Sequence, residues 1–171
     1  MAGSARYTAI LDANVLYPAT LRDLLLSLAR DGLYHARWSE RIQDEWVRSL
    51  LARRPDLEAA ALRRTCELMA QAVPDSVVQG WQSIEPGLTG LPDADDRHVL
   101  AAAICGHADV TFNLSDFPVE GLAPFGVEAK HPDDFSAQPT RPESDRDAQV
   151  AQSVSTTAEA IRNCSLQSKP T

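Results

Sequence analysis

The chain has 171 residues, a formal net charge of −8, and an apolar share of 44% with only 6% aromatic residues. This length fits one domain of ordinary size with an extension, and the apolar composition favours helices packed on a small sheet. No apolar run is long enough to cross a bilayer, and the first nine residues lack the pattern of a signal peptide. We therefore expect a soluble, cytoplasmic protein with no membrane partner.

The first half of the chain is predicted to form a strand followed by three helices. Residues 7–12 form a short buried strand that ends in a polar residue. A helix follows over residues 18–32, because its leucines recur at i, i+3, i+4 and i+7 between a proline and a glycine. A second helix begins at Ser39 and is ended by Pro55, and a third, over residues 56–72, forms a hairpin with it. The inward positions predicted for the third helix are Leu57, Ala60, Ala61, Leu68 and Met69.

The second half continues the alternation of strands and helices. Residues 75–92 are rich in Gly and Pro and form a loop, in which Val77 and Val78 could make a short strand. A helix is predicted over residues 93–106, with its apolar face formed by Val99, Leu100, Ala103 and Ile104. Strands follow at residues 108–112 and 126–129. This order predicts an α/β fold with a parallel sheet, in which active groups lie at the carboxyl ends of the strands.

The composition changes after residue 135 to Ser, Gln, Pro, Asp and Arg, which is poor material for a core. We therefore predict one compact domain over residues 1–135. Residues 136–171 are expected to form a polar linker and a weakly helical C-terminal extension.

Four carboxylates occupy notable positions, in the segments AILDANVLYP, RIQDEWVRSL, LPDADDRHVLAAA and DVTFNLSDFP: Asp12, Glu45, Asp96 and Asp116. Hard divalent cations such as Mg²⁺ and Mn²⁺ are held by a few oxygen ligands on a rigid frame. Carboxylates that a fold gathers together repel one another, so they need a cation to offset their charge. The segments lie far apart in the sequence, and only the fold can bring them together.

Each acid also has a simpler explanation. Asp12, with Asn14 two residues later, offers two oxygen ligands, although an acid after a strand also commonly caps a turn. Asp93, Asp95 and Asp96 could cap a helix, but three acids in four residues exceed what a cap requires.

The remaining two acids have equally ordinary alternatives. Glu45 could be a surface acid on its helix, and Asp116 could belong to an ordinary turn. His98, one turn into its helix, is expected at the surface or as a support for a ligand, and we leave it outside the catalytic set.

Taken together, LDANVLYP, the acid of DEW, LPDADDRHVLAAAI and TFNLSDFP resemble the PIN domain, of the bacterial type found in VapC-like toxins of type II toxin–antitoxin pairs. The resemblance covers roughly residues 7–135. It implies a PIN-like three-layer α/β/α sandwich with a central parallel sheet, whose acids bind Mg²⁺ or Mn²⁺ and cut RNA. By position, the catalytic and metal-binding acids are Asp12, Glu45, Asp96 and Asp116. The supporting residues are Asn14, Asp93 and Asn113.

The implied activity is that of a divalent-metal-dependent endoribonuclease in which water is the nucleophile and the products carry a 5′-phosphate and a 3′-hydroxyl. The four acids titrate as a coupled group, so no single general base is assigned. The expected partners are an RNA substrate and a cognate antitoxin, in a homodimer or a toxin–antitoxin hetero-oligomer. Four arginines are expected to offset the repulsion between the acids and RNA: Arg22, Arg37, Arg41 and Arg48.

Other functions remain possible on the residues alone. A phosphotransfer or dehalogenase-type enzyme would use Asp12 as a nucleophile, but it would want a second Asp where this chain has Asn14. A catalytically silent PIN-fold binding module and a housekeeping nuclease are the two further alternatives.

Overall fold

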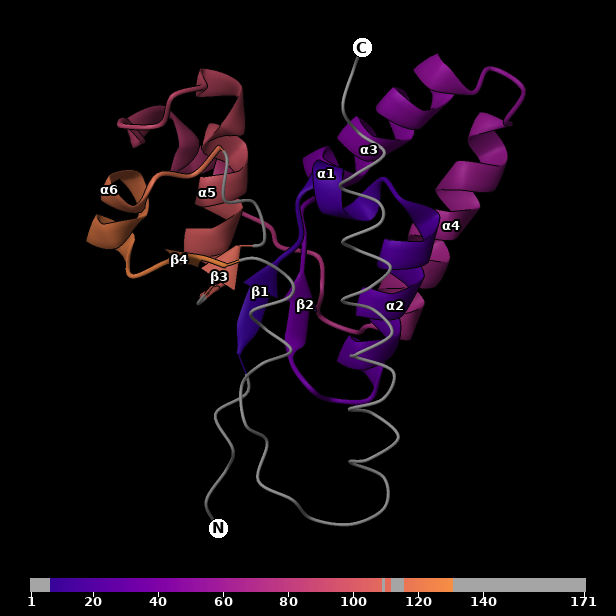
Figure 1. Ribbon diagram of the computed structural model, residues 1–171, viewed down its shortest axis with the longest axis horizontal. Coiled ribbons are helices and arrows are strands. Elements are labelled where there is room, and N and C mark those ends of the chain that lie inside the picture. Colours follow the sequence, from indigo (N-terminus) through magenta and orange to yellow (C-terminus); the bar gives the residue numbers. More distant parts are fainter. Residues whose placement is uncertain (1–6, 109, 112–115, 131–171) are drawn as a thin grey trace, which may run out of the picture. The chain divides into compact units, whose positions relative to one another are not determined.

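The computed structural model describes residues 7–108, 110–111 and 116–130, and it shows a mixed α/β fold around a small parallel sheet (Figure 1). The strands pair in the order β2-β1-β3-β4. Their bounds are Thr8–Ile10 (β1), His35–Arg37 (β2), Val110–Thr111 (β3) and Glu128–Ala129 (β4). The predicted α/β class and parallel sheet are confirmed, while the PIN-like three-layer arrangement stays a prediction.

Helices flank this sheet, with α2, α3 and α4 grouped beside β2 and with α5 and α6 beside β3 and β4 (Figure 1). The α-helices are α1 (Ala13–Leu16), α2 (Ala19–Arg30), α3 (Glu40–Arg53), α4 (Ala59–Ala72), α5 (Arg97–Cys105) and α6 (Val119–Leu122). The 3₁₀ turns are η1 (Trp81–Ser83), η2 (Glu85–Gly87), η3 (Ala94–Asp96) and η4 (Ala123–Phe125). Within the described ranges, no helix has the length and apolar character that a membrane span needs.

Strand β1 lies in the middle of the sheet and carries the chain to the candidate site. Its residues Ala9 and Ile10 are fully buried, as is Leu11, which explains the unbroken apolar run in the sequence. The strand is shorter than predicted, although the Leu11 N–H still donates to the Arg37 carbonyl at 2.8 Å. Asp12 then begins α1, a one-turn helix that the sequence analysis did not predict.

The predicted signals at the ends of α2 and α3 are both confirmed. Gly32, with φ of 81°, ends α2 in a Schellman motif, in which its N–H donates to Ala29 and the Leu33 N–H donates to Leu28. Ser39 starts α3, since its side chain accepts a hydrogen bond from the Ile42 N–H at 3.2 Å.

Helix α4 differs from its prediction in its start and in its buried face. It begins at Ala59 rather than at residue 56, because the chain turns at Pro55 and Asp56, where the Leu57 N–H donates to the Arg54 carbonyl at 3.1 Å. The inward face predicted for this helix was wrong for most of its members. The buried residues at its inward face and end are Leu62, Met69 and Val73, whereas Ala60, Ala61 and Leu68 are exposed.

The second half of the chain follows the predicted order with corrections. The helix predicted over residues 93–106 starts as the 3₁₀ turn η3 and becomes α-helical only at Arg97. Helix α5 is buried on more sides than the predicted apolar face, since His98, Ala101 and Ala102 are also enclosed. Val77 forms an isolated parallel bridge with Trp38 rather than a strand. The predicted domain boundary at residue 135 and the C-terminal extension lie outside the described residues.

Candidate active site

Three of the four predicted acids line one pocket in the structure. Asp12 follows β1, Glu45 lies on α3, and Asp96 stands where η3 passes into α5. Together with Asn14 of α1 they surround a space of about 220 Å³. The segments that the sequence analysis singled out separately are therefore adjacent in the fold, and the carboxylates face the same space.

Asp12 is held rigidly at this pocket. The residue is only 4% exposed, and its Oδ1 accepts a hydrogen bond from the Val15 N–H at 3.0 Å. The carboxylate therefore caps α1, as the simpler explanation required. It also lines the pocket, so the cap fixes the direction of a carboxylate on the pocket wall.

Asp96 is the acid whose ionisation the site disturbs most clearly. Its pKa is raised to about 6, first by desolvation and then by the negative charges of Asp116, Asp93 and Asp12, while His98 acts in the opposite direction. Its side chain makes no capping hydrogen bond. The cap of this turn is instead Asp93, whose Oδ1 accepts from the Asp95 N–H at 2.9 Å. A capping role therefore explains Asp93 and does not explain Asp96.

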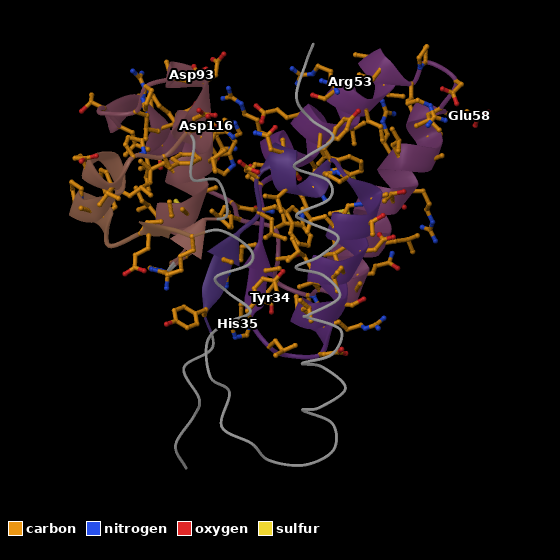
Figure 2. The ribbon with its side chains drawn as sticks, viewed as in Figure 1. Tyr34, His35, Arg53, Glu58, Asp93 and Asp116 are labelled. Atoms are coloured by element: carbon orange, nitrogen blue, oxygen red, sulfur yellow. The ribbon has the colours of Figure 1, made fainter. Side chains whose placement is uncertain are left out.

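Asp116 and Asp93 do not line the pocket, but the negative charge of each raises the pKa of Asp96. Their two labels lie close together in the view of Figure 2. Asp95 is exposed and does not line the pocket. Asn113, the remaining supporting residue, lies outside the described residues.

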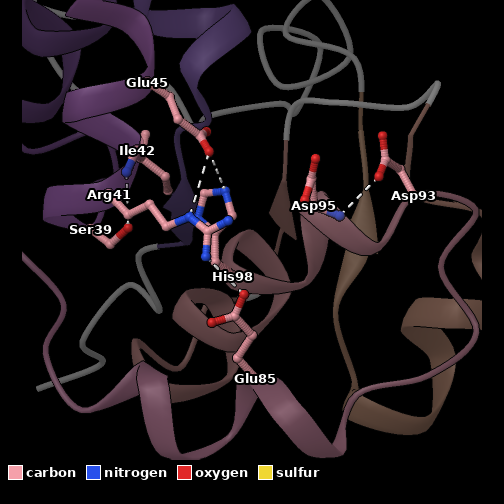
Figure 3. Close-up of polar contacts among 8 residues, drawn as sticks. All are labelled: Ser39, Arg41, Ile42, Glu45, Glu85, Asp93, Asp95 and His98. Atoms are coloured by element: carbon pink, nitrogen blue, oxygen red, sulfur yellow. Dashed lines mark hydrogen bonds and ion pairs between the residues drawn. The ribbon is translucent and has the colours of Figure 1, made fainter. Parts of the chain in front are cut away.

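Glu45 contacts two basic groups through one oxygen (Figure 3). Its Oε1 lies 2.9 Å from His98 Nε2 and 3.7 Å from Arg41 Nε. Of the two roles expected for His98, the surface position was wrong, because its side chain is 1% exposed, while the supporting role stays a prediction. Its spacing from Ala101 and Ala102 on an apolar helix is the sequence signal that indicates burial.

The four arginines expected near the acids have different environments. Arg22 is buried, where it donates to the Leu16 carbonyl at 2.8 Å and stacks over the ring of Trp46 at 4.5 Å. Arg41 is bound to Glu85 at 2.9 Å, and Arg37 packs beside Gly106. Arg48 alone of the four is exposed and lines the pocket.

The donor set suits a hard divalent cation. Three carboxylates and an Asn side chain line one pocket, and burial together with the negative charges of Asp116, Asp93 and Asp12 raises the pKa of Asp96. Across residues 7–108, 110–111 and 116–130, no three acidic, histidine or cysteine side chains form a compact ligand cluster. Mg²⁺ usually keeps several waters and takes only one or two carboxylates, so separate donors around a pocket fit its chemistry.

Part of the chain is similar to a protein of Mycobacterium tuberculosis (strain ATCC 25618 / H37Rv) named "Putative ribonuclease VapC50", with 55% identity over 42 residues. The match covers 23% of this chain and 25% of that protein, so the chain spans about a quarter of its relative's length. No protein-family model matches the chain, and no solved structure matches it. The similarity supports a relation to a VapC-like ribonuclease for the matched segment.

Proposed function

We propose that the chain is a divalent-metal-dependent endoribonuclease with a PIN-like three-layer fold, and that it is the toxin of a type II toxin–antitoxin pair. The observation that carries this proposal is the placement of Asp12, Glu45 and Asp96 around one pocket at the carboxyl end of β1. The local similarity to a protein named as a ribonuclease supports the choice of RNA as the substrate.

Mg²⁺ or Mn²⁺ would be held by Asp12 and Asp96, with Glu45 and Asn14 on the same pocket and Asp116 adding negative charge nearby. When bound, such an ion supplies Lewis acidity, which draws charge from phosphodiester oxygens and makes water easier to deprotonate.

The protein contributes fixed positions for these donors. Asp12 is held by the Val15 N–H, and Glu45 is held from the side of α5 by His98. Arg48 adds a guanidinium at the pocket without an ion-pair partner among the described residues, so it is available for an RNA phosphate.

The test is cleavage of a labelled RNA during a titration with Mg²⁺ or Mn²⁺. Asp96→Asn and Glu45→Gln should reduce cleavage by about two orders of magnitude or more, because each removes a charged pocket donor. The chain offers a matched control for each variant. Asp95→Asn and Asp44→Asn change exposed neighbouring acids outside the pocket, and both should retain activity.

The outcomes separate the alternatives. An intact protein that binds RNA but does not cut it at any metal concentration would be a silent binding module. Cleavage by a chain that is harmless when expressed alone, and that forms no complex with a neighbouring small protein, would indicate a housekeeping nuclease. The toxin proposal instead predicts a cytoplasmic protein that arrests cell growth when it is expressed alone. An antitoxin should relieve this arrest by forming a hetero-oligomer with the chain.

A further inference from the structure

His98 is a buried polar residue whose surroundings give it a single polar contact within the described part of the chain. It is the second residue of α5, and its Nε2 lies 2.9 Å from Glu45 Oε1 (Figure 3). Its other ring nitrogen, Nδ1, is buried and has no hydrogen-bond partner there. Buried polar atoms are normally paired, so the structure retains this histidine at a cost.

The ring is also fixed in orientation. Its centroid lies 5.9 Å from that of Trp81, with 58° between the two planes. Nε2 is the ring nitrogen that faces the Glu45 carboxylate, so an N–H on Nε2 donates to that carboxylate, whereas Nδ1 has no partner among the described residues.

Glu45 needs such a partner to keep one conformation. It is a long side chain, 29% exposed, at the edge of the pocket. Arg41 is its neighbour at i−4, but Arg41 lies 3.7 Å from Glu45 and directs its 2.9 Å hydrogen bond to Glu85 instead. The nearer contact of Glu45 is therefore His98.

We propose that His98 is a positioning residue that holds the Glu45 carboxylate at the pocket shared with Asp12 and Asp96, and thereby sets the affinity of that pocket for a divalent cation. This inference rests on the proposed function. Asp96 and His98 stand two residues apart at the start of α5. This turn therefore supplies the Asp96 carboxylate to the pocket and, through His98, orients the Glu45 carboxylate.

The test measures Mn²⁺ binding to the full chain by calorimetry, with RNA cleavage as a second measurement. His98→Leu should weaken Mn²⁺ binding by about 10- to 100-fold, the usual effect of losing a residue that orients a ligand. His98→Gln should keep the affinity within about threefold, because its amide Nε2 can occupy the place of the imidazole Nε2. His98→Asn, whose shorter amide cannot reach Glu45, should behave like His98→Leu.

Two comparisons distinguish positioning from packing. Leu100→Ala removes a buried side chain from the same helix and should lower stability without changing Mn²⁺ affinity. In a Glu45→Gln background, His98→Leu should cause no further loss of affinity, because the two residues act as one unit.

The inference is overturned if His98→Leu and His98→Asn bind Mn²⁺ as the wild type does, or if their losses persist in the Glu45→Gln background. A wild-type chain that neither binds Mn²⁺ nor cuts RNA would overturn the proposed function together with this inference. Wild-type binding and cleavage with no effect of His98 would overturn the inference alone.

Discussion

Asp96→Asn should stabilise the protein when no metal is present. The folded state raises the pKa of Asp96 from 3.8 to about 6, so ionising this carboxyl is less favourable in the fold than in the unfolded chain. This difference corresponds to at most about 3 kcal/mol when the group is ionised. Solvent screening reduces this penalty for the half-buried carboxyl, and the favourable interaction of its negative charge with the N-terminus of α5 offsets a further part. Asp96→Asn should therefore raise the free energy of unfolding by about 1 kcal/mol.

The pH dependence of this gain follows from its sign. The folded protein binds the Asp96 proton more tightly than the unfolded chain does, so the cost of ionising the desolvated carboxyl beside other acids is absent below the unfolded pKa of 3.8 and complete above the folded pKa of about 6. Asn does not ionise, and the advantage of Asp96→Asn should grow as the pH rises through this window.

Urea unfolding in the presence of EDTA, at about pH 4.5 and pH 7.5, measures the free energy of unfolding of both proteins. Asp95→Asn is the control, since Asp95 is exposed on the same turn and does not act on Asp96. With saturating Mn²⁺ the order should reverse, because the wild type gains more binding energy. A destabilising Asp96→Asn at pH 7.5 in EDTA, or a gain that is equal at both pH values, would refute the electrostatic reasoning.

Further outcomes are expected elsewhere in the chain. Arg48→Glu should weaken RNA binding and reduce its salt dependence, measured as the slope of log affinity against log salt. Arg63→Glu, on an exposed face of α4, should change the affinity and the slope less. Equal effects of the two variants would remove Arg48 from the RNA contacts. Ser39→Ala should lower the free energy of unfolding by about 1 kcal/mol through the lost cap of α3. An unchanged urea midpoint would contradict that capping role. Gly32→Ala should destabilise by about 1 kcal/mol because its φ of 81° disfavours a side chain, and thermal unfolding that matches the wild type would show that the turn adapts.

The elements that the sequence predicted best are those defined by local chemistry. Ser39 satisfies a backbone N–H at the start of α3, and Gly32 adopts a conformation that other residues disfavour. Both requirements act within a few residues, so they are visible in the sequence. The strand at the start of the chain was visible for a different reason, since Ala9 and Ile10 are buried in a parallel sheet and such strands form unbroken apolar runs in the sequence.

The errors arise where tertiary packing decides between patterns that the sequence leaves nearly equal. Alanine carries little information about burial, and the buried face of α4 is set by Leu62 and Met69 rather than by Ala60 and Ala61. The environment of His98 depends on a contact with a helix 53 positions earlier in the chain, at Glu45. A helical pattern can indicate that such a histidine is buried, but it cannot name its partner.

The three acids before α5 show how the fold assigns different tasks to similar residues. Because the segment is a 3₁₀ turn before it becomes α-helical, its side chains do not follow a single helical face. Asp93 turns back to accept the Asp95 N–H, Asp95 points to solvent, and Asp96 faces the pocket. The capping bond of Asp93 thus fixes the turn that directs Asp96 toward Asp12.

On this reasoning Asp93→Ala should reduce metal affinity less than Asp96→Asn but more than Asp95→Asn. Calorimetry with Mn²⁺ can test this order of affinities. An Asp93→Ala variant with the same Mn²⁺ affinity as Asp95→Asn would show that the turn holds without its cap.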